Sequence, residues 1–528
     1  MKVKALVMAG GKGTRMGIDE KPLVKIRGEP MIKLVLNALI KARSVEEVIV
    51  LTSRYTPKTT RVVKEMKLPR VKVMESPGAG FVEDIRYAIR NLGPEVYLVV
   101  SADLPLITPS LIDFIVERYE KCGRSSLAVM IPTYVYELLG LKPSYVFKVG
   151  ERSVVPSGIN LIDGSKLREE ELDEEYLVIA HEGLAMNVNR PEDISVCEKF
   201  LSEREQIQRA SFSWICEELR KLLAEAVRRN LGEAVLLSGG LDSSVVAYLA
   251  SKLTKVEAIT VLVKSNCAKD REYASLMAKF LNMEHHIIEV SIDEVLRHIP
   301  RVIEIMRTFD PMQVRNDVVI YLGLTRAKSL GFSSIMTGDG ADELFAGYSY
   351  LCGMDEERRE LELRVLWAAM NFSSITLGNH IGIEVKTPYL DKRIRYFAML
   401  IKPEHRVREE RGVTWGKWIL RKAFEDVLPQ EIVWRIKSPI EEGAGTNVLT
   451  KYFDEVIDDQ EFQESICKIM EKDSVVIRDK EQLYYYRVFR SIFGPPKDIG
   501  GVGKECPQCR ARIPKGFTYC RVCGAYPV

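Results

Sequence analysis

The sequence predicts two α/β domains with doubly wound, mostly parallel sheets, followed by a small cysteine-rich ribbon. Short apolar strands alternate with amphipathic helical segments, which is the pattern of parallel sheets covered by helices. Twice, after residues 3–8 and after residues 234–237, a strand runs through a glycine-rich turn into a helix. Two Cys-x-x-Cys pairs then lie near the end of the chain. Together these observations define the expected fold class.

Composition narrows the classes of function. The 528 residues are 46% hydrophobic and 28% charged, which is typical of soluble globular proteins. Lys and Arg number 76 against 74 Asp and Glu, so the net charge of +2 demands neither nucleic acid nor an anionic membrane. Apolar runs stay below membrane-spanning length, and the first residues resemble a strand rather than a secretory signal. We therefore expect a cytoplasmic protein.

The charged stretch around residues 202–231 carries apolar residues at helical spacing, which predicts a helix that connects the two large domains. Further on, Gly-Pro-Pro and Gly-Gly-Val-Gly indicate a linker. We accordingly divide the chain into a first domain (1–203), a connecting helix (204–230), a second domain (231–493), a linker (494–503) and a ribbon (504–528).

The first glycine turn contains Gly10, Gly11 and Gly13. Glycines let the backbone approach phosphate groups closely, and cations placed beside them neutralise the charge of a departing pyrophosphate. Two cations, Arg15 and Lys21, follow the turn and are candidates for this role. A strand over residues 96–100 leads to Asp103, a carboxylate suited to hold Mg²⁺ beside a nucleotide.

These features resemble nucleotidyltransferases, and more closely the archaeal adenosylcobinamide-phosphate guanylyltransferases. The resemblance rests on residues 8–23, 52–59, 77–84 and 156–160, spread over nearly all of the first 200 residues. It implies that GTP transfers GMP to the phosphate of a corrinoid precursor. The molybdenum-cofactor guanylyltransferases share the opening but not the later segments. Asn187 lies where related transferases complete the metal site, although such stretches also cap helices.

The second glycine turn directs backbone N–H groups, a helix N-terminus and serine hydroxyls at one spot, which favours an anion. A carboxylate within it makes sense if it holds Mg²⁺ together with phosphates, and a second carboxylate in the loop 338–348 completes such a site. The sequence therefore predicts a Mg·ATP site, although the Gly-Lys-Ser/Thr signature of a P-loop is absent from this turn. Its candidate residues are Ser238, Gly239, Gly240, Asp242, Ser243, Ser244, Gly338 and Asp342.

This turn resembles the pyrophosphate loop of the ATP-pyrophosphatases, with an adenine nucleotide alpha hydrolase-like fold. Residues 235–445 resemble, in order, the synthetase domain of asparagine synthetase and the β-lactam synthetases. The resemblance implies that a carboxylate attacks the α-phosphate of ATP and that ammonia or another amine takes the acyl-adenylate. Lys437 matches the family lysine that stabilises charge on the α-phosphate and on the intermediate.

Two departures from that family affect the expected substrates. The residues ahead of the synthetase segment are not the family's glutaminase half, so we expect ammonia from solution or from a partner, or a different amine. Asp339 and Ala341 stand where the family has Glu and Ser, in a loop that faces the acceptor. These replacements put aspartate as the acceptor in doubt.

The four cysteines at the end of the chain, Cys506, Cys509, Cys520 and Cys523, form paired knuckles separated by ten residues, which predicts a structural tetrahedral Zn²⁺ site. A ribbon this small has too little core to fold without metal. Its basic residues permit RNA contact without establishing it. The other six cysteines are expected to be reduced thiols, and the adjacent His285 and His286 are expected to pack rather than to chelate one ion.

The sequence therefore favours a bifunctional enzyme with a guanylyltransferase in front and an AMP-forming amide synthetase behind. Mg²⁺ and Zn²⁺ are the expected metals, with ATP and GTP as substrates. One alternative is an ammonia-dependent asparagine synthetase with an incidental transferase. Another is an enzyme that adenylates RNA or protein. The acceptor, the amine donor and the oligomeric state stay open.

Overall fold

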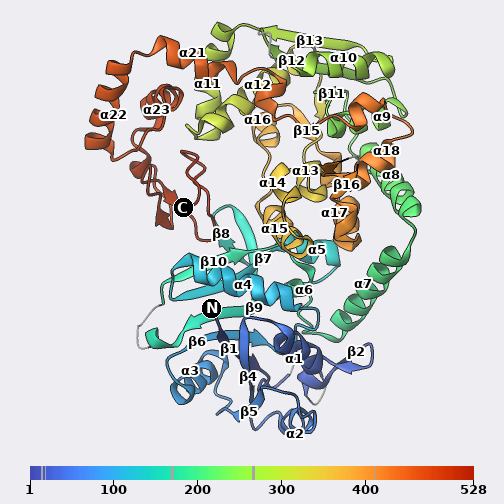
Figure 1. The fold of residues 1–528 in the computed structure, drawn as a ribbon, viewed down its shortest axis with the longest axis vertical. Coiled ribbons are helices and arrows are strands. Elements are labelled where there is room, and N and C mark those ends of the chain that lie inside the picture. The colour runs from blue at the N-terminus through green and yellow to red at the C-terminus, as the bar shows by residue number, and fades with distance from the viewer. Residues whose placement is uncertain (14–15, 18–19, 168–171, 265–267, 411) are drawn as a thin grey trace. The chain divides into compact units, whose positions relative to one another are not determined.

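The computed structural model describes residues 1–13, 16–17, 20–167, 172–264, 268–410 and 412–528. The chain forms two compact units, drawn in Figure 1. The first comprises residues 1–210, 350–369 and 399–404, and the second comprises residues 211–349, 370–398 and 405–528. Each unit is built on a largely or wholly parallel sheet with helices, which confirms the predicted α/β class.

Among the described residues, the first unit has an eight-stranded sheet in the order β10-β7-β9-β6-β1-β4-β5, with β8 paired to β9. The central strands are parallel, whereas β9 runs antiparallel to β6, β7 and β8. The strands are β1 (Val3–Met8), β4 (Val45–Thr52), β5 (Val71–Glu75), β6 (Val96–Ser101), β7 (Ser126–Pro132), β8 (Phe147–Val149), β9 (Arg152–Asp163) and β10 (Glu174–Val178).

Helices of the first unit follow from capping and apolar periodicity. Thr108 caps α4 by accepting a hydrogen bond from the Leu111 N–H, and Pro109 occupies the first turn, where its missing N–H is harmless. The helices include α1 (Met31–Lys41), α2 (Pro57–Glu65), α3 (Phe81–Leu92), α4 (Pro109–Cys122), α5 (Thr133–Leu139) and α7 (Pro191–Arg209).

One further helix of the first unit, α15 (Glu356–Ala369), comes from the middle of the later sequence. Glu362 on α15 accepts hydrogen bonds from Arg118 on α4. The guanidinium of Arg364 lies 3.4 Å from the buried Glu182 carboxylate. The polypeptide therefore leaves the second unit after residue 349 and contributes a helix to the first unit.

The second unit has a five-stranded, wholly parallel sheet in the order β13-β12-β11-β14-β15. Its strands are β11 (Ala234–Leu236), β12 (Glu257–Val263), β13 (His285–Val290), β14 (Ser334–Met336) and β15 (Glu384–Lys386). The chain turns to one side after β11 and returns to the other side with β14, so these adjacent strands form a topological switch point. Loops after such strands create the crevice where ligands bind in open parallel sheets.

Helices pack against this sheet, and buried side chains of the helices and strands form a shared hydrophobic core. Gly323 of α12 lies so close to β11 that a Cβ there would stand 2.9 Å from the Leu236 side chain. The helices include α8 (Phe212–Arg229), α9 (Leu241–Ser251), α10 (Asp270–Phe280), α11 (Ile292–Met306), α12 (Pro311–Ser329), α13 (Ala341–Phe345), α16 (Ser373–Ile381), α18 (Trp418–Phe424), α21 (Val448–Val456), α22 (Asp459–Asp473) and α23 (Lys480–Phe493). Within the described residues, no helix is both long and apolar enough to cross a membrane.

The cysteine-rich ribbon is part of the core of the second unit. Its short strands β18 (Lys504–Glu505) and β19 (Arg512–Ile513) pair antiparallel. The four cysteines lie in the same hydrophobic cluster as Phe309 and Phe489. The N–H of Phe309, just before α12, donates to the Val522 carbonyl at 2.8 Å, and the Tyr519 hydroxyl donates to Asp310. The ribbon therefore packs directly on the start of α12.

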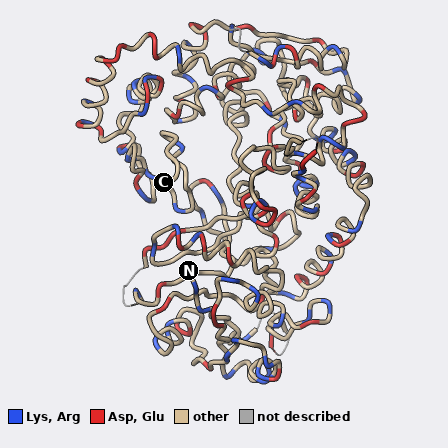
Figure 2. Tube along the Cα trace, viewed as in Figure 1, with Lys and Arg blue, Asp and Glu red and all other residues tan. Residues whose placement is uncertain are grey.

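Charged residues of both signs are interleaved along the chain. Figure 2 shows residues of both signs along long helices such as α7.

Candidate active sites

The turn between β11 and α9 is shaped by close backbone packing. Gly239 has a φ of +68°, and a Cβ there would lie 2.3 Å from the backbone of Tyr273, so only glycine fits without displacement. The Ser238 and Ser243 hydroxyls are 3.1 Å apart, and the Gly240 N–H donates to the Ser238 hydroxyl. Serine hydroxyls and the N-terminus of α9 therefore gather at one end of the sheet.

The loop after β14 reaches the same place. Gly338 packs against α9, where a Cβ would lie 2.9 Å from the Cβ of Asp242 and 2.9 Å from the Ser243 nitrogen. This close approach sets Asp342 beside Asp242, as the adjacent strand ends lead one to expect. The sequence-predicted residues of the second site are therefore brought together.

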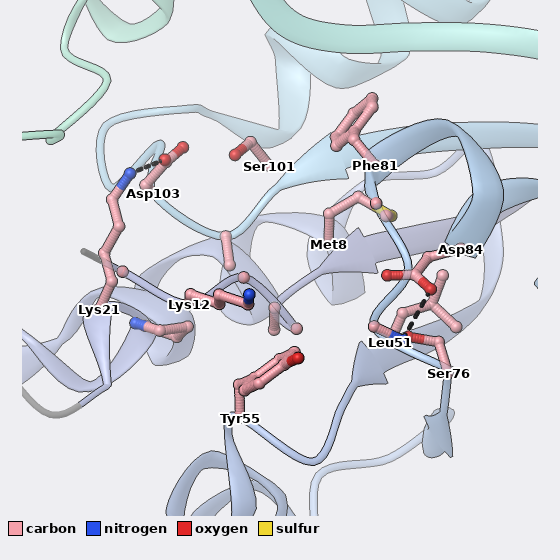
Figure 3. Close-up of a pocket in the computed structure, with 18 of the residues that line it drawn as sticks. Met8, Lys12, Lys21, Leu51, Tyr55, Ser76, Phe81, Asp84, Ser101 and Asp103 are labelled. Atoms are coloured by element: carbon pink, nitrogen blue, oxygen red, sulfur yellow. Dashed lines mark hydrogen bonds and ion pairs between the residues drawn. The ribbon is translucent and has the colours of Figure 1, made fainter. Parts of the chain in front are cut away.

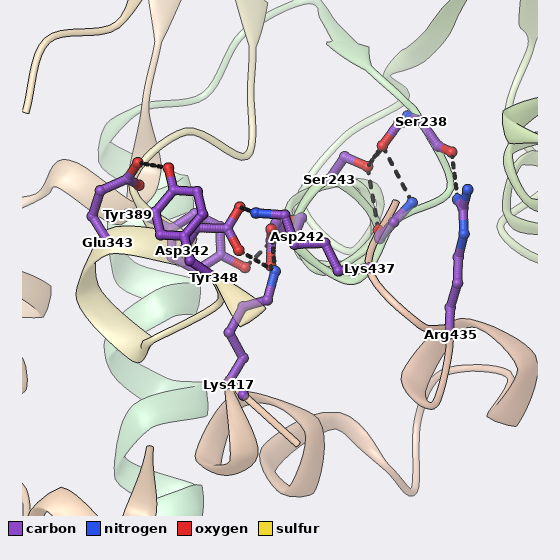
Figure 4. Close-up of polar contacts among 12 residues, drawn as sticks. Ser238, Asp242, Ser243, Asp342, Glu343, Tyr348, Tyr389, Lys417, Arg435 and Lys437 are labelled. Carbon is purple, nitrogen blue, oxygen red and sulfur yellow. Dashed lines mark hydrogen bonds and ion pairs between the residues drawn. The ribbon is translucent and has the colours of Figure 1, made fainter. Parts of the chain in front are cut away.

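Two lysines join the two carboxylates (Figure 4). The Lys417 Nζ lies 2.9 and 2.7 Å from the two Asp242 oxygens and 2.8 Å from Asp342 Oδ1. The Lys437 Nζ lies 2.6 Å from Asp342 Oδ2. Two negative and two positive groups thus form one charge-balanced cluster.

Burial and the opposite charges act against each other on the protonation of Asp342 and Lys417. Burial alone would raise the pKa of Asp342, but the ammonium groups of Lys417 and Lys437 outweigh it and lower that pKa to about 2. Burial would likewise lower the pKa of Lys417, and the two carboxylates instead raise it above its ordinary value. Asp342 is therefore ionised and Lys417 charged at neutral pH.

The donor set fits a magnesium ion. Mg²⁺ prefers carboxylate oxygens together with phosphates and water. The Lys417 ammonium contacts oxygens of both Asp242 and Asp342, which marks the space between them as a place for positive charge. A divalent cation would draw on the same oxygens and would free the two lysines to face phosphate groups.

The sequence does not predict a role for Lys417, although this residue lies within the span 235–445 that resembles the synthetase family. Lys417 is 4% exposed and adopts a left-handed φ of +54° at the N-cap of α18. Non-glycine residues held in that region are strained and cluster at functional sites. In the sequence, Lys417 stands before the apolar residues Trp418, Ile419 and Leu420, which by itself is a weak indication of function.

Two further carboxyl groups, Asp339 and Glu343, follow β14 in the chain. Asp339 accepts hydrogen bonds from Thr337 and from Ser374 at the start of α16. Burial, with a contribution from the neighbouring Asp342, raises the pKa of Glu343 to about 7. Its partner Tyr348 donates a hydrogen bond to it and places its ring 4.2 Å from the Lys437 ammonium.

Arg435 supports the turn after β11. Its guanidinium donates to the Ser238 carbonyl at 3.0 Å and to Asp270 at 2.7 Å. It also lies 4.1 Å from the centre of the Tyr273 ring. Because Arg435 stands two residues before Lys437, this anchoring fixes the segment that carries the lysine.

The first unit contains a pocket of about 480 Å³ around its glycine turn (Figure 3). In the figure one end carries Lys21 and Asp103, and the other end carries Asp84 and Ser76. The lining residues are Met8, Ala9, Gly10, Gly11, Lys12, Gly13, Met16, Lys21, Pro22, Leu51, Tyr55, Ser76, Gly78, Ala79, Gly80, Phe81, Asp84, Ser101, Ala102, Asp103 and Asn189.

Lys21 and Asp103 form the charged end of this pocket. The Lys21 Nζ contacts Asp103 Oδ2 and lies 2.7 Å from Asn189 Oδ1. Among the described residues, no hydrogen-bond donor reaches the other oxygen of Asp103, which is buried. A buried carboxylate oxygen in this state fits a Mg²⁺ ligand. Arg15, the other predicted cation, lies outside the described residues.

The asparagine that lines this pocket is Asn189, rather than Asn187, the candidate that the sequence suggests for the metal site. Asn187 accepts a hydrogen bond from the Asn189 side chain at 2.6 Å and so holds that residue in place. The two asparagines are two positions apart, and the sequence alone offered no means of choosing between them.

The four ribbon cysteines meet with the spacing of a metal site. Their sulfurs lie within 4.8 Å of one another, and the Cys506–Cys523 and Cys509–Cys520 pairs are 3.6 and 3.7 Å apart. Ligands about 2.3 Å from a tetrahedral zinc lie roughly 3.8 Å from each other. The geometry is therefore compatible with zinc. His285 and His286 have different partners, Thr260 and Glu257.

Comparisons with known proteins agree with this division of sites. Residues 218–376 and 373–498 match the asparagine synthase family model, and residues 5–155 match the MobA-like NTP transferase domain. The chain is 30% identical over 306 residues to "Asparagine synthetase [glutamine-hydrolyzing]" of Zea mays, covering 53% of this chain and 51% of that protein.

Two other relatives give similar figures. A probable asparagine synthetase [glutamine-hydrolyzing] of Dictyostelium discoideum is 29% identical, covering 56% of each chain. Asparagine synthetase B [glutamine-hydrolyzing] of Escherichia coli (strain K12) is 27% identical, covering 56% of this chain and 57% of that protein. The chain thus spans about half the length of the curated relatives it matches. The chain belongs to the asparagine synthase family and carries a MobA-like NTP transferase domain in its N-terminal part.

Proposed function

We propose that the chain is a bifunctional enzyme. Its second unit forms amides from ATP, a carboxylate and an amine through an acyl-adenylate, with release of AMP. Its first unit transfers GMP from GTP to a phosphorylated acceptor, for which adenosylcobinamide phosphate is our candidate. The observation that carries the synthetase proposal is the cluster in which Lys417 joins Asp242 to Asp342 at the ends of adjacent strands.

In the second unit, an acceptor carboxylate oxygen attacks the α-phosphorus of ATP. The bond from that phosphorus to the bridging oxygen breaks, and pyrophosphate leaves toward the serine-lined turn. This turn receives the pyrophosphate through backbone N–H groups and hydroxyls, which come from Ser238, Gly239, Gly240, Ser243 and Ser244. An amine nitrogen then attacks the acyl carbon, AMP departs with the bonding electrons, and the amine loses a proton.

Lys437 and Lys417 supply fixed positive charge during both steps. The α-phosphate gains charge as the carboxylate attacks it, and a preorganised cation stabilises that charge more than water does. Asp242 and Asp342 would hold Mg²⁺ in this site, and Asp103 would hold it in the first unit. When bound, the ion would neutralise the phosphates and orient the leaving pyrophosphate.

In the first unit, a phosphate oxygen of the acceptor attacks the α-phosphorus of GTP, and pyrophosphate leaves. The backbone of Gly10, Gly11 and Gly13 approaches the phosphates closely. Lys21 neutralises the leaving group, with Arg15 in the same role by family resemblance. Lys21 and Asp103 line one pocket, which supports their assignment to one site.

We further propose the functional division given by the sequence, with a transferase domain (1–203), a connecting helix (204–230), a synthetase domain (231–493), a linker (494–503) and a ribbon (504–528). Zn²⁺ bound by the four cysteines of the ribbon would be structural, because four thiolates leave no open coordination position.

We propose the acceptor of the synthetase from the arrangement of domains in the chain. Fusion of the two domains in one chain favours a shared pathway, so a corrinoid side-chain carboxylate is our candidate, with Asp339 beside it. The second candidate is ammonia-dependent asparagine synthesis, favoured by the names of the matching relatives. The amine comes from solution or from a partner in either case.

The test is release of AMP and pyrophosphate from Mg·ATP and ammonium, with aspartate, carboxylated corrinoids and bulk tRNA offered separately. Stimulation by a corrinoid supports the main proposal. Stimulation by aspartate alone replaces it with asparagine synthesis, and stimulation by tRNA alone replaces it with an RNA-modifying role. Lys437→Ala serves as the control that should remove any genuine signal.

A further inference from the structure

The pocket of the first unit has two chemically different ends (Figure 3). Its charged end carries Lys21 and Asp103 beside the glycine turn, where phosphates belong. Its far end carries Asp84 and Ser76, and Met8 and Leu51 line the apolar stretch between them. A nucleotide whose triphosphate occupies the charged end therefore directs its base toward Asp84.

Asp84 has only one oxygen committed to the protein. It lies near the start of α3, is 6% exposed, and turns back onto the loop before the helix. Its Oδ1 accepts the backbone N–H groups of Gly78 at 3.0 Å and Ala79 at 3.3 Å. In the described part of the chain no donor contacts Oδ2, which lies on the pocket side in Figure 3.

The neighbouring serine does not compete for this role. The Ser76 hydroxyl donates its proton to the Thr52 carbonyl at 3.1 Å, so it offers the pocket only an uncharged oxygen. Asp84 brings a carboxylate to this end, and an anionic acceptor binds hydrogen-bond donors more strongly than a neutral hydroxyl does. An ionised carboxylate accepts hydrogen bonds and donates none.

Among the nucleobases, guanine presents two adjacent donors, N1–H and the 2-amino group. Adenine and cytosine place a ring-nitrogen acceptor beside their amino group, and a carboxylate repels that acceptor. We infer that Asp84 reads the base and selects guanine by accepting hydrogen bonds from this donor edge. The inference rests on the proposed guanylyl transfer and assigns the residue behind its nucleotide preference.

Asp84→Asn gives a sharp test because the backbone fixes which way the amide faces. The Gly78 and Ala79 N–H groups require an acceptor, so the asparagine carbonyl takes the place of Oδ1 and its NH₂ group faces the base. That donor opposes guanine but suits xanthine, whose C2 carries an oxygen in place of the amino group. The loop contact survives, so the variant should fold.

We would measure binding of Mg·GTP, Mg·ITP and Mg·XTP to the full chain; ATP is omitted because the second unit is proposed to bind it. The wild type should bind GTP more tightly than ITP and XTP. Asp84→Asn should weaken GTP binding by ~10–100-fold and strengthen XTP binding, so the preference should reverse. The reason is that the buried NH₂ group of the asparagine would face the donors of guanine, and a buried polar group without a matching partner costs binding energy. Asp84→Ala should weaken GTP binding without favouring XTP.

Glu83→Gln is the matched control, because this adjacent carboxylate is exposed and is absent from the pocket lining. It should leave the GTP to XTP ratio unchanged. A folded Asp84→Asn protein that keeps the wild-type ratio overturns the assignment of Asp84 while guanylyl transfer stands. A wild-type protein that does not bind GTP overturns the guanylyl-transfer proposal itself.

Discussion

In each of the two candidate nucleotide sites, a lysine contacts the carboxylate that is expected to hold the metal. The sites differ in how many of the carboxylate oxygens already have a partner in the protein. In the first unit Lys21 contacts one oxygen of Asp103, and no described donor reaches the other. In the second unit Lys417 and Lys437 balance Asp242 and Asp342 within one cluster, in which Lys417 is buried and Lys437 is exposed. The first site can accept a cation without losing a contact, whereas the second must exchange its lysine contacts for it.

Removing a carboxylate from the second site is the most direct test of whether the two sites act independently. Asp342→Ala should lower AMP formation by ~100-fold or more, because it removes both a candidate metal ligand and the partner of two lysines. GMP transfer should be unaffected. Both activities are measured on the same preparation, and loss of GMP transfer in folded protein would contradict independent sites.

The reciprocal change is Lys21→Ala. We expect it to lower GMP transfer by ~100-fold, in line with the loss of a preorganised group that stabilises developing charge. AMP formation should stay at the wild-type level. Lys2→Ala, at an exposed position outside the pocket, is the matched control. An equal fall in both activities would point to misfolding rather than to a local role.

Lys417→Met tests the charge balance of the second site. Removing one partner of a buried ion pair typically destabilises a protein by about 3–5 kcal/mol, because an uncompensated charge stays buried. We expect a lower thermal midpoint for the second unit, and a larger recovery on adding Mg²⁺ than in the wild type. Lys422→Met, in the following helix and paired with Glu425, is the control. Equal responses to Mg²⁺ in all three proteins would contradict the exchange of lysine for metal.

A smaller effect concerns Glu343, whose pKa burial raises from 4.5 to about 7. A carboxyl group with a raised folded-state pKa favours folding at low pH, and this contribution is lost as the pH rises from about 4.5 to 7. The full shift corresponds to about 3 kcal/mol at most. Glu343→Gln should therefore flatten the decline in thermal midpoint of the second unit between pH 5 and 7. An unchanged slope would show that Glu343 ionises normally.

Much of the arrangement could be predicted from the sequence because local signals sufficed. The strand, glycine turn and helix around Asp242 are contiguous, and Asp342 follows an adjacent strand, so parallel topology alone brings them together. Lys417 escaped prediction because its position depends on a left-handed residue and on a segment 175 positions away in the chain. The placement of α15 in the first unit escaped it as well, since pairs such as Arg364 with Glu182 are set by tertiary packing.

The cysteine-rich ribbon is tied closely to the second unit. The carbonyl of Cys523 accepts hydrogen bonds from Arg478 and Gln482, and a Cβ at Gly524 would lie 2.3 Å from Asp310 Oδ1. If the four thiolates bind zinc as proposed, they would also help to hold α12 in place. Gly323 of α12 packs against β11, the strand that leads into the turn at Ser238. Loss of zinc or oxidation of these thiols would then weaken the proposed synthetase site and leave the proposed transferase site unaffected.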